Sequence, residues 1–126
     1  MYELKYKDMF GTTYILRFRI GTYAADKSLA IHAFYEEEDG MWCPFAGVTV
    51  CLGSENRLNC AYIDENNVSG IGEVLEKAGV AKPTGRTAQS GFCVYPEYEF
   101  NEDILKKMDA RDYSVYLNLY KGCYGW

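Results

Sequence analysis

The sequence predicts an α+β fold with a mostly antiparallel sheet of five to seven strands and about three helices, two of them C-terminal. Two observations support this class. Short segments with alternating apolar and polar residues recur through the first half of the chain, which is typical of half-buried strands. Later segments place apolar residues three or four positions apart, which is typical of helices that pack on a sheet.

The length and composition favour a single domain over residues 1–126. A chain of this size buries roughly two thirds of its unfolded surface in one core. The hydrophobic content of 48% and charged content of 25% are those of an ordinary globular protein. The apolar runs are too short to cross a bilayer, and the N-terminus has no apolar signal region. We therefore expect a cytoplasmic protein that does not bind membranes.

The first two segments, residues 2–7 and 13–20, alternate in period two and predict an N-terminal hairpin with one apolar face. The other face gathers four cations beside one carboxylate: Lys5, Lys7, Arg17 and Arg19 with Glu3. We interpret it as a solvated outer face. The alternative, an anion or nucleic-acid contact, requires more basic residues than these.

Residues 28–36 are apolar in nearly every position, which predicts a central strand covered on both faces with His32 in the core. An acidic turn follows. The candidate partner-binding site of the chain consists of the acidic residues of this turn and the nearby tryptophan: Glu36, Glu37, Glu38, Asp39 and Trp42. Pro44 makes residues 41–45 an edge strand or a loop, because proline lacks the amide donor of a central strand.

Residues 46–52 and 59–64 predict two further strands. The pair 66–67 is a possible cap for a helix whose apolar stripe is Ile71, Val74, Leu75 and Ala78. Residues 82–91 contain two glycines and two basic residues, and we interpret them as a connecting loop; a phosphate cradle is the alternative, although no P-loop spacing is present.

Residues 92–100 predict a strand, and Asn101 then predicts a helix N-cap. Acidic residues follow in the first turn of this helix and lysines in its last turn, as the helix dipole favours. From Asp109 onward, tyrosines recur at helical spacing and predict a final helix. A strand remains the alternative for residues 110–121.

Five cysteines are present, an odd number in a chain without a secretory signal, so a disulfide framework is not expected. Four of them fall in or beside predicted strands and would together form one structural zinc site: Cys43, Cys51, Cys60 and Cys93. No Cys-x-x-Cys pair is present, and buried free thiols are the alternative. We assign no catalytic residue, because the one histidine has no recognisable nucleophile motif around it.

The chain carries 13 basic and 18 acidic residues, for a net charge of −5. This balance argues against direct nucleic-acid binding through a broad basic face and favours a protein partner with a basic surface. The 12 tyrosines are consistent with a half-apolar, half-wet contact surface or with an aromatic core.

The stretches 59–67, 83–86 and 90–100, the last containing Ser-Gly-Phe-Cys-Val-Tyr-Pro, resemble a family of small uncharacterised proteins. That family is carried by bacteriophages, plasmids and conjugative elements of Firmicutes. The resemblance implies a mobile-element setting and no inherited catalytic residue.

Two hypotheses follow. The first is an inhibitor of anti-CRISPR or antirestriction type that uses its acidic and aromatic surface to block a basic surface of a host defence effector. The second is a zinc-stabilised or thiol-containing accessory module that binds proteins without inhibiting such an effector.

Overall fold

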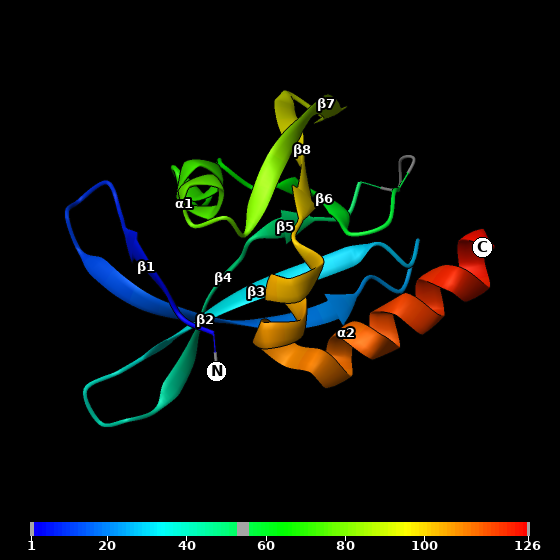
Figure 1. Ribbon diagram of the computed structural model, residues 1–126. Coiled ribbons are helices and arrows are strands. Elements are labelled where there is room, and N and C mark those ends of the chain that lie inside the picture. Colours follow the sequence, from blue (N-terminus) through cyan, green and yellow to red (C-terminus); the bar gives the residue numbers. More distant parts are fainter. Residues whose placement is uncertain (1, 53–55, 126) are drawn as a thin grey trace.

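The computed structural model describes residues 2–52 and 56–125, which form two four-stranded antiparallel sheets and two helices (Figure 1). The N-terminal sheet contains, in spatial order, β1 (Leu4–Lys7), β2 (Thr13–Thr22), β3 (Leu29–Glu36) and β4 (Trp42–Gly47). The C-terminal sheet contains β5 (Thr49–Val50), β6 (Cys60–Ile63), β8 (Cys93–Phe100) and β7 (Ala81–Ser90). The α+β class is confirmed, whereas the predicted single sheet of five to seven strands is wrong.

The chain passes from one sheet to the other at Val48, which is fully buried. Its backbone N–H donates to the carbonyl of Ile31 in β3, and its carbonyl accepts from the N–H of Asp64 just after β6, both at 2.9 Å. The predicted strand over residues 46–52 is therefore divided between two sheets. One apolar residue with both backbone groups paired makes this transition without leaving a buried polar group unsatisfied.

The N-terminal sheet confirms the predicted first hairpin, because β1 and β2 pair antiparallel. The prediction that β3 is covered on both faces is wrong, since His32 is exposed. The reason is the position of the C-terminal helix, which packs against β2 at the side of the sheet (Figure 1). Strand β4 is an edge strand, which accommodates Pro44 opposite Phe34 next to a register shift.

The C-terminal sheet contains a long hairpin, β7–β8, where the sequence predicted a connecting loop over residues 82–91. That prediction is wrong because the segment is an edge strand held by backbone pairing, whose polar side chains are mostly exposed. A register shift between Pro83 and Thr87 accommodates the proline and Gly85. The polar composition of this segment led to the loop prediction, because a strand that buries little apolar surface has no apolar alternation to reveal it.

Helix α1 (Ile71–Lys77) buries Ile71 and Leu75 of the predicted stripe and half-buries Val74, whereas Ala78 is exposed at the C-cap. The predicted cap at residues 66–67 is not formed. Instead, the carboxylate of Glu65 accepts the backbone N–H groups of Gly70 and Gly72, at 2.8 and 2.7 Å. An acidic side chain suits this position because the first N–H groups of a helix carry partial positive charge.

Helix α2 (Glu102–Tyr124) replaces the two C-terminal helices that the sequence predicted, so the predicted count of three is wrong. Asn101 caps it as expected by accepting two backbone N–H groups of the first turn. The final helix was predicted to begin at Asp109, and the structure has a kink in α2 at this residue. There the backbone is extended, and the carboxylate accepts the N–H of Asp112 at 3.1 Å. The strand alternative for residues 110–121 is wrong. No helix in the described ranges is long and apolar enough to cross a membrane.

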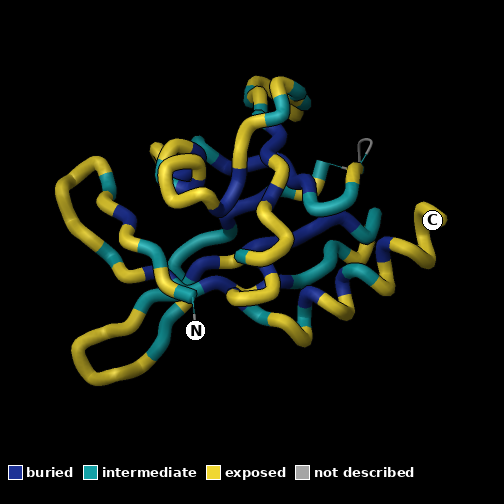
Figure 2. The backbone as a smooth tube through the Cα atoms, in the orientation of Figure 1, coloured by how far each residue is buried: buried dark blue, intermediate teal, exposed yellow. Residues whose placement is uncertain are grey.

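The core lies between the two sheets and α2, and Figure 2 shows the buried positions gathered there. The β1–β2, β3–β4 and β7–β8 turns extend beyond it and are exposed. Two turns carry aromatic side chains in full contact with solvent, Phe10 at 86% exposure and Phe92 at 105%.

A row of tyrosines on α2 holds the segment before β6 in place. Tyr113 donates to the side-chain oxygen of Asn59 at 2.9 Å, and the Tyr116 hydroxyl accepts the Asn59 backbone N–H at 3.0 Å. One helical turn later, Tyr120 donates to the carbonyl of Asn56 at 3.1 Å. Asn59 has a φ of 61°, a left-handed conformation that asparagine tolerates better than most residues. The helix therefore fixes the shape of this segment through hydroxyl groups.

We expect Tyr116→Phe to lower the free energy of unfolding by about 1–2 kcal/mol, because the Asn59 N–H loses its acceptor in a part-buried place. Tyr14→Phe is the control, since the Tyr14 hydroxyl makes no hydrogen bond to the described residues. Urea unfolding of the two variants measures the difference. Equal stabilities would contradict the role given to the Tyr116 hydroxyl.

Candidate functional site

The acidic run lies at the turn of the β3–β4 hairpin, and we call residues 36–42 the acidic arm. The turn is closed by two backbone hydrogen bonds, from Glu37 N–H to Met41 O at 2.8 Å and from Gly40 N–H to Glu37 O at 2.9 Å. Gly40 adopts φ 85°, which glycine allows without strain. The arm therefore presents its carboxylates from a defined backbone shape.

The predicted members of the arm point in different directions. The Tyr35 hydroxyl donates to Glu37 at 3.2 Å, and this hydrogen bond raises the pKa of Tyr35. Asp39 accepts the backbone N–H of Met41 at 2.9 Å. The side chains of Glu36 and Glu38 have no hydrogen bond or ion pair with the described residues. These last two carboxylates are therefore the most available to a partner.

Trp42 lies at the base of the arm, with the Arg17 guanidinium carbon 4.1 Å from its ring centroid. This is a cation–π contact, and it leaves the tryptophan half-buried. Met41, which the sequence analysis did not select, is 62% exposed. Its position directly after the acidic run could have indicated that Met41 is exposed at the same turn. The arm thus combines carboxylates with one exposed and one half-buried apolar side chain.

The four candidate zinc ligands are spread over the fold. Cys43 lies in β4 of the N-terminal sheet, whereas Cys60 and Cys93 lie in β6 and β8 of the C-terminal sheet. Cys51 is exposed and donates to a carboxylate oxygen of Asp26 at 3.4 Å. Within residues 2–52 and 56–125, no three His, Cys, Asp or Glu side chains are grouped so that they could hold a metal ion. The described structure therefore does not bring these four cysteines together.

A buried carboxylate in β8 is the main polar feature that sequence reasoning missed. Glu97 is only 1% exposed and accepts from Arg57 Nη2 at 2.5 Å and from Thr84 Oγ1 at 2.7 Å. Arg86 Nη1 lies 3.8 Å from its second oxygen. In the sequence, Glu97 and Glu99 alternate with Tyr98 and Phe100, so the pattern predicts that Glu97 faces solvent. Its burial depends on the segment that carries Arg57, which no local pattern indicates.

Cys60 is buried beside this carboxylate. Burial, and to a smaller extent the charge of Glu97, raises the pKa of the thiol from 9.0 to about 11. The thiol is therefore protonated at neutral pH and is a poor nucleophile. His32, the only histidine, is exposed on the N-terminal sheet. These positions give no support to a Cys–His nucleophile.

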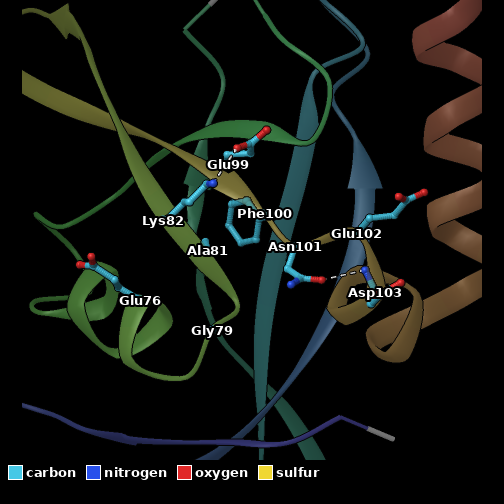
Figure 3. Close-up of a pocket in the computed structure, with 9 residues that line it drawn as sticks. All are labelled: Glu76, Gly79, Ala81, Lys82, Glu99, Phe100, Asn101, Glu102 and Asp103. Carbon is cyan, nitrogen blue, oxygen red and sulfur yellow. Dashed lines mark hydrogen bonds and ion pairs between the residues drawn. The ribbon is translucent and has the colours of Figure 1, made fainter.

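A polar hollow of about 370 Å³ lies between the end of α1 and the start of α2. Figure 3 shows the residues that line it, including Lys82, whose ammonium lies 3.7 Å from Glu99, and the capped first turn of α2. Four of the nine lining residues are carboxylates, and Asn101 already uses its side-chain oxygen for the cap. We therefore assign no ligand to this hollow.

The Cys60 thiol predicts a stability change at high pH. The unfolded chain loses this proton near pH 9, whereas the folded chain keeps it to about pH 11. The unfolded state is therefore favoured progressively as pH rises through this window, by roughly 2–3 kcal/mol from this group. We expect Cys60→Ala to show a smaller loss of unfolding free energy between about pH 8 and pH 11 than the wild type. Urea unfolding tests this, and equal losses would contradict it.

The Arg57–Glu97 pair predicts a non-additive pair of substitutions. We expect Arg57→Ala to lower the free energy of unfolding by about 1–3 kcal/mol, because a buried carboxylate loses its nearest counterion. Adding Glu97→Gln to Arg57→Ala restores part of this loss, because a neutral amide needs no counterion. Lys82→Ala is the control, since its pair with Glu99 is exposed and contributes little. Chemical unfolding of the wild type, the two single variants Arg57→Ala and Glu97→Gln and their double variant gives the coupling, with Lys82→Ala alongside, and additive effects would refute it.

Comparison with known proteins gives a family and no activity. A search of curated proteins and a search of solved structures found no match. A family model described as "Domain of unknown function (DUF4313)" matches residues 17–119, which run from within β2 through β8 to most of α2. Because this match covers most of the chain, the protein belongs to the DUF4313 family.

Proposed function

We propose that this protein inhibits a host defence effector that targets nucleic acids, of the anti-CRISPR or antirestriction type. The acidic arm binds the basic surface on which the effector holds its nucleic acid and thereby blocks that surface. The observation that carries the proposal is the run of four exposed carboxylates at a hydrogen-bonded turn that extends away from the core (Figure 1).

Charge complementarity supports the proposal. A nucleic-acid-binding surface is lined with lysine and arginine to neutralise phosphates. Four consecutive carboxylates offer a comparable local density of negative charge, and the net charge of −5 adds a favourable long-range field. Attraction of this kind accelerates encounter with a basic surface and disfavours acidic ones.

The geometry of the arm also lowers the cost of binding. The closed turn holds the backbone of residues 37–41 in one shape, so less conformational entropy is lost when a partner binds. Met41 gives an apolar contact within a charged rim, as stable interfaces require. The resemblance of the chain to proteins of phages, plasmids and conjugative elements of Firmicutes supports the biological setting.

The second candidate is a zinc-stabilised or thiol-containing accessory module that binds proteins. The described residues give it no specific support, because no metal-binding group is found among them. We therefore rank it below the inhibitor.

We expect expression of the protein in bacteria with an active CRISPR or restriction system to raise the transformation efficiency of a targeted plasmid by at least about tenfold. The variant Glu36→Lys/Glu38→Lys should lose this protection, because each reversal replaces attraction to the basic surface with repulsion. Transformation of targeted and untargeted plasmids, counted in parallel, measures the effect.

Glu76→Lys is the matched control, since Glu76 is an exposed glutamate on α1, outside the arm. Protection should survive this change. Lack of protection in a panel that includes several CRISPR and restriction systems would refute the proposed function, and so would equal activity of the arm variant and the control.

A further inference from the structure

We propose that the outer face of the N-terminal sheet binds single-stranded nucleic acid. This basic-aromatic face consists of side chains that emerge on one side of β1 to β4: Lys5, Lys7, Ile15, Arg17, Arg19, His32, Phe34 and Trp42. It shares Trp42 with the acidic arm, and Glu36, the cross-strand partner of Trp42, emerges on the same side of the sheet. The cations and Phe34 lie outside the arm, so the inference goes beyond the proposed function.

The register of the strands places the cations and rings together. Arg17 lies directly opposite Phe34, and Arg19 lies opposite His32. Trp42 pairs with Glu36 in the next strand, two residues from Phe34, and its ring contacts the Arg17 guanidinium. The face is open to solvent along much of its length. Two aromatic rings and two arginines therefore occupy one accessible patch of antiparallel sheet.

This patch contains a shallow hollow of about 330 Å³, lined by Arg17, Phe18, Arg19, Phe34 and Trp42. Aromatic side chains beside guanidinium groups can bind a ligand that has both a planar ring and a negatively charged group. A nucleotide has both parts, because its base stacks on aromatic side chains and its phosphate accepts hydrogen bonds from arginine. The chemistry of the hollow thus matches one nucleotide of a strand.

Two further cations lie on α2. Arg19 also borders a second hollow, of about 500 Å³, whose wall includes Lys107 and Arg111 together with the carboxylates of Asp109 and Asp112. A strand that places a base at Phe34 therefore finds further cations for its next phosphates. The sequence showed four basic residues on this face, and the fold adds two from the helix together with the aromatic rings. A basic track with stacking platforms is the usual design of single-strand binding surfaces.

Nearby carboxylates lower the affinity of this face for phosphates but do not cover it. Arg17 Nε lies 2.8 Å from Glu3, and Arg19 contacts Asp109 and Asp112 at 3.3 and 3.1 Å. These ion pairs are substantially exposed, and pairs of that kind contribute little because water competes with them. Phosphates can therefore replace or share them. We expect modest affinity that falls steeply with salt.

The face favours a single strand over a duplex. In a duplex the bases stack on one another, and their faces are not available to Phe34 or Trp42. An acidic peptide would use the cations but not the rings. Dependence on an aromatic ring therefore separates the proposed ligand from both alternatives.

The test is fluorescence anisotropy of a labelled oligothymidylate of about 12 nucleotides at low salt, with the full-length protein. We expect saturable binding, and we expect Phe34→Leu to weaken it at least about fivefold because the apolar packing remains but the stacking ring is lost. Lys107→Ala should lower the slope of log Kd against log salt, because one fewer phosphate is neutralised.

Two controls match these changes in chemistry. Phe92→Leu alters a fully exposed ring on the other sheet, and Lys82→Ala removes a lysine there. Both should bind as the wild type does. A thermal melt of each variant confirms that it folds.

Absence of binding at low salt would overturn the proposal. It would also be overturned if the duplex of the same sequence, or polyglutamate, bound as tightly as the single strand, or if Phe34→Leu bound normally. The arm variant Glu36→Lys/Glu38→Lys keeps the rings and arginines of this face, so it should still bind the oligonucleotide. Its behaviour distinguishes failure of this inference from failure of the inhibitor proposal.

Discussion

The hydrogen bonds between the tyrosines of α2 and the segment 56–59 add a second connection between the two sheets, beside the backbone pairing at Val48. On its other side, α2 packs against β2, where Arg19 contacts two of its carboxylates. The helix thus joins the N-terminal sheet to the segment that leads into β6. That segment carries Arg57, whose guanidinium neutralises the buried Glu97 in β8. The tyrosine contacts on both sides of Arg57 therefore help to hold this guanidinium beside the buried charge.

This arrangement explains where the two proposed binding surfaces lie. The core is concentrated between the sheets and α2, so the outer halves of β1 to β4 extend past it and keep both faces near solvent. On the inner side of the extension, Tyr14, Tyr35 and Phe45 pack in T-shaped or tilted pairs, with ring centroids 4.8 to 6.1 Å apart. These aromatic contacts support the hairpins where the core is thin. The outer side is left for charged and aromatic side chains.

The sequence predicted those parts of the fold that depend on local pattern. The first hairpin, the buried stripe of α1 and the Asn101 cap each follow from a few neighbouring residues. The division into two sheets was not predictable, because it depends on Val48 pairing with residues 17 positions before and 16 after it. The strand at residues 81–90 was missed because an exposed edge strand has no apolar period. The acidic turn could be predicted from four consecutive residues of the sequence. The burial of Glu97 could not, because it depends on Arg57, which lies 40 residues away in the chain.

Trp42 is the point at which the two proposed surfaces meet. It belongs to the acidic arm by sequence, yet its ring lies against Arg17 on the basic-aromatic face. Carboxylates at the arm repel phosphates, so they limit how far a strand can extend along β3 and direct it toward Arg19 and α2. In the inhibitor proposal, the same carboxylates attract a basic protein surface to the end of the hairpin. If both proposals hold, the separation of charge along the sheet places the effector at its tip and the nucleic-acid strand on its face.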